Sequence, residues 1–518
     1  MRILFIYINP TGRTAVPPNL SMLIGHLKAN RPYEVSLFDT SFYKFDFGKP
    51  VVPNAWTTGY FVPVKNKIEL PRRDSDLHED LRKQIASFKP DLIATSYYSN
   101  QQAIVRDLLE PVKKEFPRIP VVAGGCHPSF EPEESINESY VDMICVGEGE
   151  RTLVELCDKI HARQDYSAVE GIWLKKDGKV IRNPVGAPID LDSLGDPDWD
   201  IFDPAHIYQP FHGNYFRVGM IEFGRGCPYR CTYCSNRKYL DIYAGHRGEY
   251  FRHRTPKLFI ERLKNLKEKY SLEMIYFQEG TFLTMPDDVL EELSTLYAEH
   301  IDLPSIILTT VHTINEKRVK CLKHMRCLYV NLGIEEGNPE FREKYLRRKM
   351  TNKQVVDAFK LLKKYKIYTA AYNVIGFPYE TRSDIFRTID LNRSSGPDSV
   401  YAQIFYPIQG SELRDWCIKE GFFDPGLDSL YTQILGVGNA AILKSLKMSR
   451  EEIHGLLKTF YLYVRMPKAA YPLISFLERD TRFSRKAVAG LTRYYWAREP
   501  RFSDAVDLMR HSGNGARL

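Results

Sequence analysis

The stretch Arg225-Gly-Cys-Pro-Tyr-Arg-Cys-Thr-Tyr-Cys-Ser235 decides how this chain folds and what it binds. It places Cys227, Cys231 and Cys234 in a C-x3-C-x2-C spacing within one loop. Thiolates are the usual protein ligands of iron–sulfur clusters, and this spacing lets one loop wrap three corners of a cubane. Three thiolates on a four-iron cluster leave one iron open. The loop therefore predicts a 4Fe–4S cluster with one vacant coordination site.

The open iron gives this loop its chemistry. The amino and carboxylate groups of S-adenosylmethionine can chelate it, and an electron from the cluster can then cleave the sulfonium to a 5′-deoxyadenosyl radical. The alternatives are a structural zinc site or three incidental thiols. Structural zinc takes four ligands, usually with two paired C-x2-C knuckles, and the next candidates, His246 and His253, have no matching knuckle. The position of the loop directly after a strand that opens a β/α series favours the cluster.

The composition is that of an ordinary globular protein, with 518 residues, 43% hydrophobic and 26% charged, and a net charge of +7. Basic and acidic residues alternate along the helical stretches, which argues against a nucleic-acid partner. No apolar run reaches the roughly 18 residues of a membrane-spanning helix, and residues 3–8 form a strand rather than a signal peptide. We therefore expect no integral membrane segment and a cytoplasmic location. The other six cysteines are scattered and form no disulfide framework: Cys126, Cys145, Cys157, Cys321, Cys327 and Cys417.

Upstream of the cluster loop, short apolar runs alternate with amphipathic stretches. Strands separated by helices indicate an α/β fold with a parallel, doubly wound, Rossmann-like sheet, whose ligands bind beyond the carboxyl ends of the strands. Residues 1–165 are assigned to this domain, and residues 166–214 to a linker with a hairpin closed at Asp177-Gly178. Strands are expected at residues 2–8, 34–39, 91–96, 120–124 and 143–146.

Downstream, a second β/α series begins near Val218 and is assigned to residues 215–416. Six parallel strands with a helix after each describe a partial (β/α)6 barrel, whose active site gathers at the carboxyl ends of the strands. Residues 417–518 are expected to be mostly helical, with a disordered end at residues 512–518. The six strands are expected at residues 219–223, 274–277, 305–309, 328–333, 369–375 and 399–405.

The C-terminal region is rich in aromatic and basic residues. Its aromatic side chains either cover the active site or pack a helical core, and we expect the core. The stretch 465–486 mixes basic and apolar residues, which leaves peripheral membrane contact as an alternative. The aromatic residues concerned are Tyr461, Tyr463, Tyr494, Tyr495 and Trp496.

Over roughly residues 1–415 the sequence resembles the radical S-adenosylmethionine superfamily, and within it the cobalamin-binding class. Phe277-Gln-Glu-Gly-Thr-Phe282 is similar to a family strand end, F-x-D-D-x-F. The resemblance implies that Glu279 contacts the amino group of S-adenosylmethionine, although Gly280 replaces the second acid. Gly333-Ile-Glu-Glu-Gly337 resembles G-x-E-S-G, which nominates Glu335 for the ribose hydroxyls.

Four more positions are nominated for S-adenosylmethionine by the same resemblance, and Tyr233 is one of them. Asn373-Val-Ile-Gly-Phe-Pro-Tyr-Glu-Thr381 is similar to the I-x-G-x-P-x-E-T strand end, whose apolar and backbone groups line the adenine, which nominates Asn373 and Ile375. Phe405-Tyr-Pro-Ile-Gln-Gly-Ser-Glu-Leu413 resembles P-x-P-G-T-x-L and nominates Tyr406, with Gln409 in place of a proline. Tyr233 is the aromatic residue before the last cluster cysteine. Taken alone, a strand-end acid is most often solvated or a helix cap.

The N-terminal half resembles the family's cobalamin domain, and the alternative is a generic flavodoxin-like domain with ordinary tight turns. Glycines after the strands would let the nucleotide tail of the cofactor lie against the sheet. The loop after the first strand, residues 9–16, lacks the D-x-H-x-x-G histidine that binds cobalt in other cobalamin proteins, so no histidine ligand is expected from it. We expect His127 to cap a loop and Cys126 to be a buried thiol. The residues nominated for cobalamin are Pro17, Thr95, Ser96, Gly124, Gly125, His127, Gly147, Glu148 and Gly149.

Three functions are compatible with these motifs. The first is a radical methyltransferase in which methylcobalamin supplies a methyl group to an unactivated carbon or phosphorus centre. The second uses the same cofactors for cyclisation, ring contraction or oxidation, and the third is a cobalamin or iron–sulfur sensor. The resemblance favours the first, with a small-molecule or natural-product substrate and an electron donor such as flavodoxin or ferredoxin. No catalytic residue beyond the cofactor contacts is identified.

Overall fold

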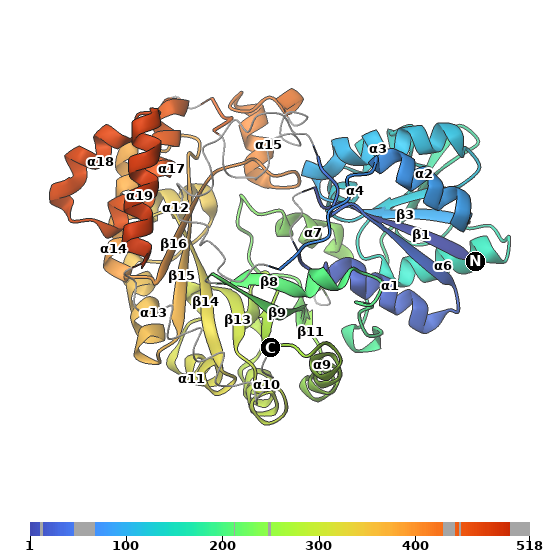
Figure 1. Ribbon diagram of the computed structural model, residues 1–518, viewed down its shortest axis with the longest axis horizontal. Helices are drawn as coiled ribbons and strands as arrows, with labels where there is room; N and C mark the ends of the chain where they lie inside the picture. Colours follow the sequence, from blue (N-terminus) through green and yellow to red (C-terminus); the bar gives the residue numbers. More distant parts are fainter. Residues whose placement is uncertain are drawn as a thin grey trace.

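The computed structural model describes residues 1–10, 14–45, 68–211, 213–246, 250–427, 441–444 and 447–497, with side chains up to residue 495. Two seven-stranded sheets stand side by side, with helices on both faces of the N-terminal sheet and on the outer face of the second (Figure 1). The predicted α/β class is confirmed, with a Rossmann-like N-terminal sheet, a partial barrel and a helical C-terminal region. The predicted disorder of residues 512–518 lies outside the described residues. No described helix is long and apolar enough to cross a membrane.

The N-terminal sheet has the strand order β2-β1-β3-β4-β5-β6-β7. Its first five strands are parallel, and the hairpin β6–β7 continues the sheet antiparallel from β5. Strand β1 is buried on both faces because helices cover both sides of the sheet, which explains its unbroken apolar run. The strands are β1 (Arg2–Tyr7), β2 (Glu34–Asp39), β3 (Leu92–Ser96), β4 (Val121–Gly124), β5 (Met143–Cys145), β6 (Ile172–Lys176) and β7 (Lys179–Arg182).

The helices of this half follow the strands in the predicted alternation. Asp76 begins one of them by accepting a hydrogen bond from the Glu79 amide with its carboxylate. The helices are α1 (Pro18–Asn30), α2 (Leu77–Phe88), α3 (Gln102–Glu115), α4 (Cys126–Phe130), α5 (Pro132–Asn137) and α6 (Glu150–His161).

The second sheet is the partial barrel, in the order β16-β15-β14-β13-β12-β9-β8. Six strands are parallel, and β8 (Tyr208–Phe211) pairs antiparallel with β9 at the edge. The parallel strands are β9 (Asn214–Ile221), β12 (Met274–Phe277), β13 (Ser305–Thr310), β14 (Cys327–Glu335), β15 (Tyr368–Ile375) and β16 (Ser399–Ile404). The helices around them are α9 (Pro256–Tyr270), α10 (Asp287–His300), α11 (Glu316–His324), α12 (Pro339–Leu346), α13 (Asn352–Lys364) and α14 (Arg382–Ser395).

The first barrel strand differs from the prediction at both ends. Strand β9 begins at Asn214, because β8 supplies an antiparallel partner that the sequence did not indicate. It ends at Ile221, and the chain forms a short ribbon of β10 (Gly224–Arg225) with β11 (Arg252–His253). This ribbon carries the start of the cysteine loop.

The C-terminal helices are α15 (Glu412–Lys419), α17 (Arg450–Arg465), α18 (Tyr471–Leu477) and α19 (Arg482–Ala497). Helix α17 packs against α14 and β16, so the region closes one end of the barrel (Figure 1). Tyr461 and Tyr463 are buried in this core and Tyr495 packs against it, as expected. Tyr494 differs, since it is 52% exposed. The side chain of Trp496 lies outside the described part.

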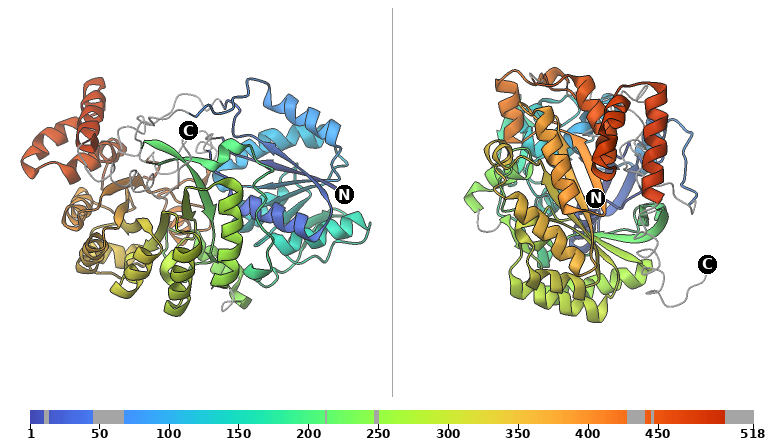
Figure 2. Two further views of the ribbon diagram at one scale, coloured as in Figure 1. Left: turned by 60° about the horizontal axis from the view of Figure 1, so that its bottom comes forward. Right: turned by 90° about the vertical axis from the view of Figure 1, so that its left-hand side faces the viewer.

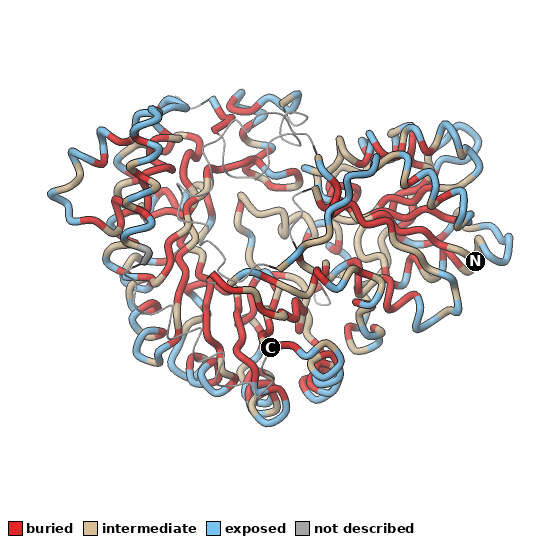
Figure 3. The backbone as a smooth tube through the Cα atoms, viewed as in Figure 1, coloured by how far each residue is buried: buried red, intermediate tan, exposed pale blue. Residues whose placement is uncertain are grey.

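The two sheets share one hydrophobic core. One cluster of buried apolar residues runs from β1 and α1 through the linker residues Trp199 and Phe202 to the barrel strands and helices. Figure 3 shows buried residues in both sheets. Gly25 of α1 lets the linker approach closely, since a Cβ there would stand 1.9 Å from the Asp196 carbonyl oxygen. The carboxyl ends of β3, β4 and β5 thereby come to face the cysteine loop.

Candidate functional site

The cysteine loop connects β10 to α7 (Asn236–Ile242) at the carboxyl end of the barrel. Gly226 enters it with φ +90°, and a Cβ there would lie 2.6 Å from the Tyr250 carbonyl oxygen, so the position requires glycine. Cys227 is buried with its Sγ 3.6 Å from Thr281 Oγ1, and the other two cysteines are half-buried. Burial raises the pKa of the Cys234 thiol to about 12.

The three thiols also influence one another electrostatically, because Cys227 and Cys231 both raise the pKa of Cys234. Within the described residues no three or more His, Cys, Asp or Glu side chains are arranged to hold a single metal ion. The thiolates of a cubane bind different irons and therefore stand farther apart than ligands of one ion. Three neighbouring thiols in one loop fit the predicted ligand set.

Glu279 lies beside this loop, just after β12. Its Oε1 accepts hydrogen bonds from the amides of Phe223 and Gly224, the latter at 3.0 Å. Its Oε2 is buried and has no hydrogen-bond partner among the described residues. Burial raises the pKa of Glu279 to about 8 against the effect of those amides. A buried carboxylate oxygen without a donor fits a site for the ammonium group of a ligand.

Gly280 stands where the family has its second acid. A Cβ at this position would lie 2.9 Å from Asn236 Nδ2, at the start of α7. The missing acid is therefore accompanied by a close approach of α7, and Glu279 is the acid that remains.

Glu335 belongs to a second polar group on the barrel's inner side. It has φ +66° at the end of β14 and is buried, which raises its pKa, while Arg348 opposes the rise. The Arg348 Nη1 atom stands 3.6 Å from Glu335 Oε1. The same guanidinium donates to Tyr233 Oη at 3.1 Å and to the Gly333 carbonyl at 2.8 Å.

Arg348 was not predicted from the sequence. It follows α12 in a run of exposed basic residues, and only the fold turns this one inward. Its positive charge lowers the pKa of Cys231, although burial raises it overall. The Arg348 Nε atom has no hydrogen-bond partner among the described residues. Arg348 thus links the cysteine loop to the strand that carries Glu335.

The remaining residues nominated for S-adenosylmethionine lie differently. Tyr406 is buried in a cluster that Tyr233 packs against. The side chain of Asn373 donates to the Tyr401 carbonyl and to Asn392 on α14, and Ile375 packs in the core under α17. Asn373 and Ile375 are two residues apart on β15, so their side chains lie on the same face of the strand. That face points to the outer helices. The predicted contact with the adenine can therefore come only from the backbone of Asn373 and Ile375.

A cavity of about 290 Å³ lies between the two sheets. Its barrel side is formed by residues next to the cysteine loop, including Glu222, Arg225, Gly226 and Asn236. Its other side is formed by the loops after β3, β4 and β5. Seven of the residues nominated for cobalamin line it: Thr95, Ser96, Gly124, Gly125, Gly147, Glu148 and Gly149.

Two glycines in these loops leave no room for a side chain. Gly125 has φ +93°, and a Cβ there would lie 2.7 Å from Ser96 Oγ. Gly147 has φ +89°, and its Cβ would lie 2.6 Å from Tyr243 Oη. These backbone cradles at the carboxyl ends of parallel strands fit a large cofactor lying against the sheet.

Two residues nominated for cobalamin lie away from the cavity. Pro17 precedes α1 and His127 packs on Tyr97, and neither lines the cavity. The His127 Nδ1 atom lies 3.0 Å from Ser99 Oγ, so the ring holds two loops together, which fits the expected role of capping a loop. Cys126, which was expected to be buried, is half-buried and lines the cavity, and the Tyr239 hydroxyl donates to its Sγ at 3.5 Å.

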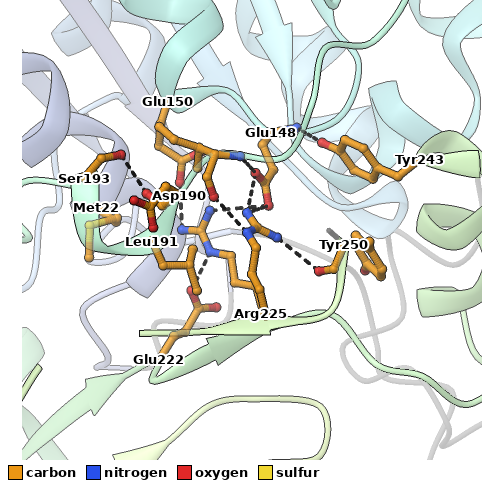
Figure 4. A network of polar contacts seen from close by, with 12 residues as sticks. Met22, Glu148, Glu150, Asp190, Leu191, Ser193, Glu222, Arg225, Tyr243 and Tyr250 are labelled. Carbon is orange, nitrogen blue, oxygen red and sulfur yellow. Dashed lines mark hydrogen bonds and ion pairs between the residues drawn. The ribbon is translucent and has the colours of Figure 1, made fainter. Parts of the chain in front are cut away.

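An ion network joins the two halves beside the cavity. Arg225 lies between three carboxylates, at 2.7 Å from Glu150, 3.1 Å from Glu222 and 3.7 Å from Glu148 (Figure 4). Arg252 also donates to both Glu148 oxygens at 2.7 Å. Burial alone would lower the pKa of Arg225, but the carboxylates raise it well above its usual value. Ion pairs thus connect the loop after β5 of the first sheet directly to the start of the cysteine loop.

Comparison with known proteins agrees with this arrangement. The model of the radical SAM superfamily matches residues 221–391, and the model of the B12 binding domain matches residues 67–157. The chain is 27% identical over 422 residues to an uncharacterized methyltransferase, PH0819, of Pyrococcus horikoshii, covering 80% of this chain and 87% of that protein. It is 28% identical over 349 residues to the anaerobic magnesium-protoporphyrin IX monomethyl ester cyclase of Rubrivivax gelatinosus, covering 65% of this chain and 60% of that protein.

A solved structure shows the same fold over nearly the whole chain. The cobalamin-dependent S-adenosylmethionine radical enzyme OxsB superposes with a TM-score of 0.67 at 15% identity, covering 96% of this chain and 71% of that chain. The two family models fall on the two halves that meet at the cavity. The predicted cofactors, cobalamin, S-adenosylmethionine and a 4Fe–4S cluster, are those of this family. The chain belongs to the cobalamin-dependent radical S-adenosylmethionine enzymes.

Proposed function

We propose that this enzyme is a methyltransferase that acts on an unactivated carbon or phosphorus centre of a small molecule. The observation that carries the proposal is the cavity between the sheets, where the cobalamin-type loops face the residues that lead into the cysteine loop. A methyl carrier and a radical generator must reach the same substrate. Holding reactants in one geometry is the main contribution that a protein makes to such a reaction.

On this proposal, Cys227, Cys231 and Cys234 bind three irons of the cluster. Glu279 Oε2 is the acceptor for the amino group of S-adenosylmethionine, because it is buried beside the loop without a donor. Glu335 receives the ribose hydroxyls. Arg348 holds the ring of Tyr233 and the end of β14 in place around them.

The cobalamin side is assigned to the loops that line the cavity. Gly124 and Gly125 after β4, and Gly147 and Gly149 after β5, present backbone to the cofactor. Thr95, Ser96 and Glu148 supply polar groups at the same edge. Pro17 and His127 are left out of this set because they do not line the cavity.

When bound, cobalamin would carry a methyl group to the substrate, and the cluster would supply the electron that cleaves S-adenosylmethionine. Each product then requires two molecules of S-adenosylmethionine. One gives methionine and 5′-deoxyadenosine after hydrogen abstraction, and the other gives S-adenosylhomocysteine after methyl donation. The electrons come from a reduced donor such as flavodoxin or ferredoxin.

The similarity to a methyltransferase over 87% of that protein's length supports methyl transfer. The cyclase relative fits the cyclisation alternative but supports it no better, and this chain spans 60% of that protein. The two reactions differ in the fate of the methyl group of S-adenosylmethionine.

The test uses a half-reaction that needs no substrate. Anaerobically reconstituted enzyme with cobalamin is reduced with titanium(III) citrate and given methyl-labelled S-adenosylmethionine. We expect label on the protein-bound corrinoid and an equal amount of S-adenosylhomocysteine. Corrinoid that stays unlabelled while 5′-deoxyadenosine accumulates would refute methyl transfer and favour cyclisation or oxidation. The variant that lacks all three cluster cysteines should still bind corrinoid but form no 5′-deoxyadenosine.

A further inference from the structure

The C-terminal helices α18 and α19 form a hairpin at the outer edge of the molecule, away from the cavity (Figure 1). One face of this hairpin packs on α17 through Ile474, Leu477 and Val488, which are all almost fully buried. Figure 2 shows the hairpin projecting from the barrel. It therefore has an inner face that belongs to the core and an outer face that the described residues do not cover.

The outer face carries large apolar side chains. Leu473 and Phe476 on α18 are 54% and 52% exposed, and Phe483 at the start of α19 is 65% exposed. These three side chains lie within eleven residues of the chain. Single exposed apolar residues are common on protein surfaces, whereas a group of them marks an interaction site.

The exposed charges around these side chains are almost all positive. The acidic residues nearby offset only part of this charge. Asp390 pairs with Lys468 and Asp480 with Arg485, while Glu478 turns inward to Arg382 and Tyr463. Arg479 stands over the ring of Phe476 at 5.4 Å, so apolar and basic groups share one surface. The exposed basic residues are Lys468, Arg479, Arg482, Arg485, Lys486 and Arg493.

We propose that this outer face of α18 and α19 docks the enzyme on the surface of an anionic phospholipid membrane. Helices that lie in a membrane interface combine exposed Leu and Phe with flanking Lys and Arg, because the apolar groups enter the acyl boundary while the cations meet the lipid phosphates. A bilayer is deformable, so it can take up apolar side chains that protrude from a projecting corner without a preformed groove. An acidic protein would satisfy the charges but would need a groove to receive Leu473, Phe476 and Phe483.

The test measures binding of the full-length, cofactor-reconstituted enzyme to sucrose-loaded vesicles by sedimentation. Vesicles of phosphatidylcholine alone are compared with vesicles that contain phosphatidylglycerol. We expect binding to the anionic vesicles only, weakened by salt because the charges lie at the surface. The variant Leu473→Ser/Phe476→Ser/Phe483→Ser should bind about tenfold or more weakly.

A charge variant tests the second component. Arg479→Gln/Arg482→Gln/Lys486→Gln should lower binding about tenfold or more. The control Lys257→Gln/Lys349→Gln/Lys353→Gln removes the same charge from exposed barrel positions and should bind like the unaltered enzyme. Circular dichroism checks that each variant is folded.

Three results of the binding assay would overturn the proposal. They are failure of the unaltered enzyme to bind anionic vesicles, equal binding by the apolar variant, and equal weakening by the barrel control. A dimer that the apolar variant converts to a monomer would also overturn it, because the face would then be an interface between two copies. Methyl transfer to the corrinoid should be unchanged in both hairpin variants, which separates this proposal from the proposed function.

Discussion

Arg225 and Glu150 form a 2.7 Å ion pair between the two halves of the molecule. Glu150 directly follows Gly149 of the cobalamin-type loop, and Arg225 stands two residues before Cys227. Burial would raise the pKa of Glu150, yet Arg225 lowers it below its ordinary value. A pair placed this way holds the domain interface together and, with it, the separation between the two proposed cofactor sites.

The first prediction concerns this pair. Arg225→Gln should lower the free energy of unfolding by about 3–5 kcal/mol, because it leaves carboxylates buried without a cation. Adding Glu150→Gln should recover part of the loss, since the double variant no longer buries the unpaired charge. A double-mutant cycle in urea measures the coupling. Strictly additive losses would contradict the assignment of Arg225 as the partner of Glu150.

The pair also predicts a pH dependence. A carboxyl whose folded pKa is depressed contributes stability above its unfolded pKa and loses it as the pH falls through the folded pKa. The stability difference between the unaltered protein and Glu150→Gln should therefore shrink below about pH 4.5.

The second prediction concerns the cobalamin cradle. Gly125→Ala should lower both stability and corrinoid retention, because the new Cβ would lie 2.7 Å from Ser96 Oγ and 2.8 Å from the Tyr97 nitrogen. Gly178 is the matched control, since it also has positive φ, +72°, but nothing lies within 4 Å of its Cβ position. Gly178→Ala should cost about 1–2 kcal/mol of backbone strain and leave corrinoid binding intact. Corrinoid absorbance after gel filtration measures retention.

Local sequence patterns predicted most of the fold. The strands at residues 34–39 and 274–277 were predicted with the bounds that the structure has, because each contains its own periodicity and end signals. The antiparallel edge strand β8 was missed, since pairing with a distant partner leaves no local pattern. The hairpin was predicted, but that it extends the N-terminal sheet was not.

The candidate site also has a part that the sequence predicted and a part that it did not. Glycine-rich loops and strand-end acids can be recognised from short motifs, and seven of the cobalamin positions do line one cavity. The inward turn of Arg348 and the network around Arg225 depend on contacts between distant segments. For Asn373 and Ile375 the motif indicated the strand end but not the face, because a motif match does not fix which way side chains point.

The third prediction tests the cluster ligands. Cys227→Ala/Cys231→Ala/Cys234→Ala should abolish the 4Fe–4S cluster, measured as iron, sulfide and visible absorption after anaerobic reconstitution. The control Cys321→Ala/Cys327→Ala/Cys417→Ala removes three buried thiols elsewhere and should retain the cluster. Four irons per chain in the first variant would refute the ligand assignment.

The last prediction concerns Glu279 and uses Glu336 as its control. Burial raises the pKa of both carboxyls to about 8, and each has one oxygen without a hydrogen-bond partner among the described residues. A carboxyl with a raised folded pKa holds a proton that the unfolded chain has lost. Its contribution to stability therefore falls as the pH rises from about 4.5 to about 8, by up to about 1.4 kcal/mol per pH unit.

Replacing either residue by glutamine removes that penalty while keeping an oxygen for the backbone amides. Without cofactors, Glu279→Gln and Glu336→Gln should each become more stable relative to the unaltered chain between pH 5 and pH 8, as measured by urea unfolding. Only Glu279→Gln should weaken binding of S-adenosylmethionine to the cluster-loaded enzyme, by about ten- to a hundredfold, since it loses a charged hydrogen bond. Equal effects of the two variants on that affinity would show that Glu279 acts through the fold alone. A stability penalty in the empty protein, combined with a specific gain on binding, is what a carboxylate placed for a cationic ligand should show.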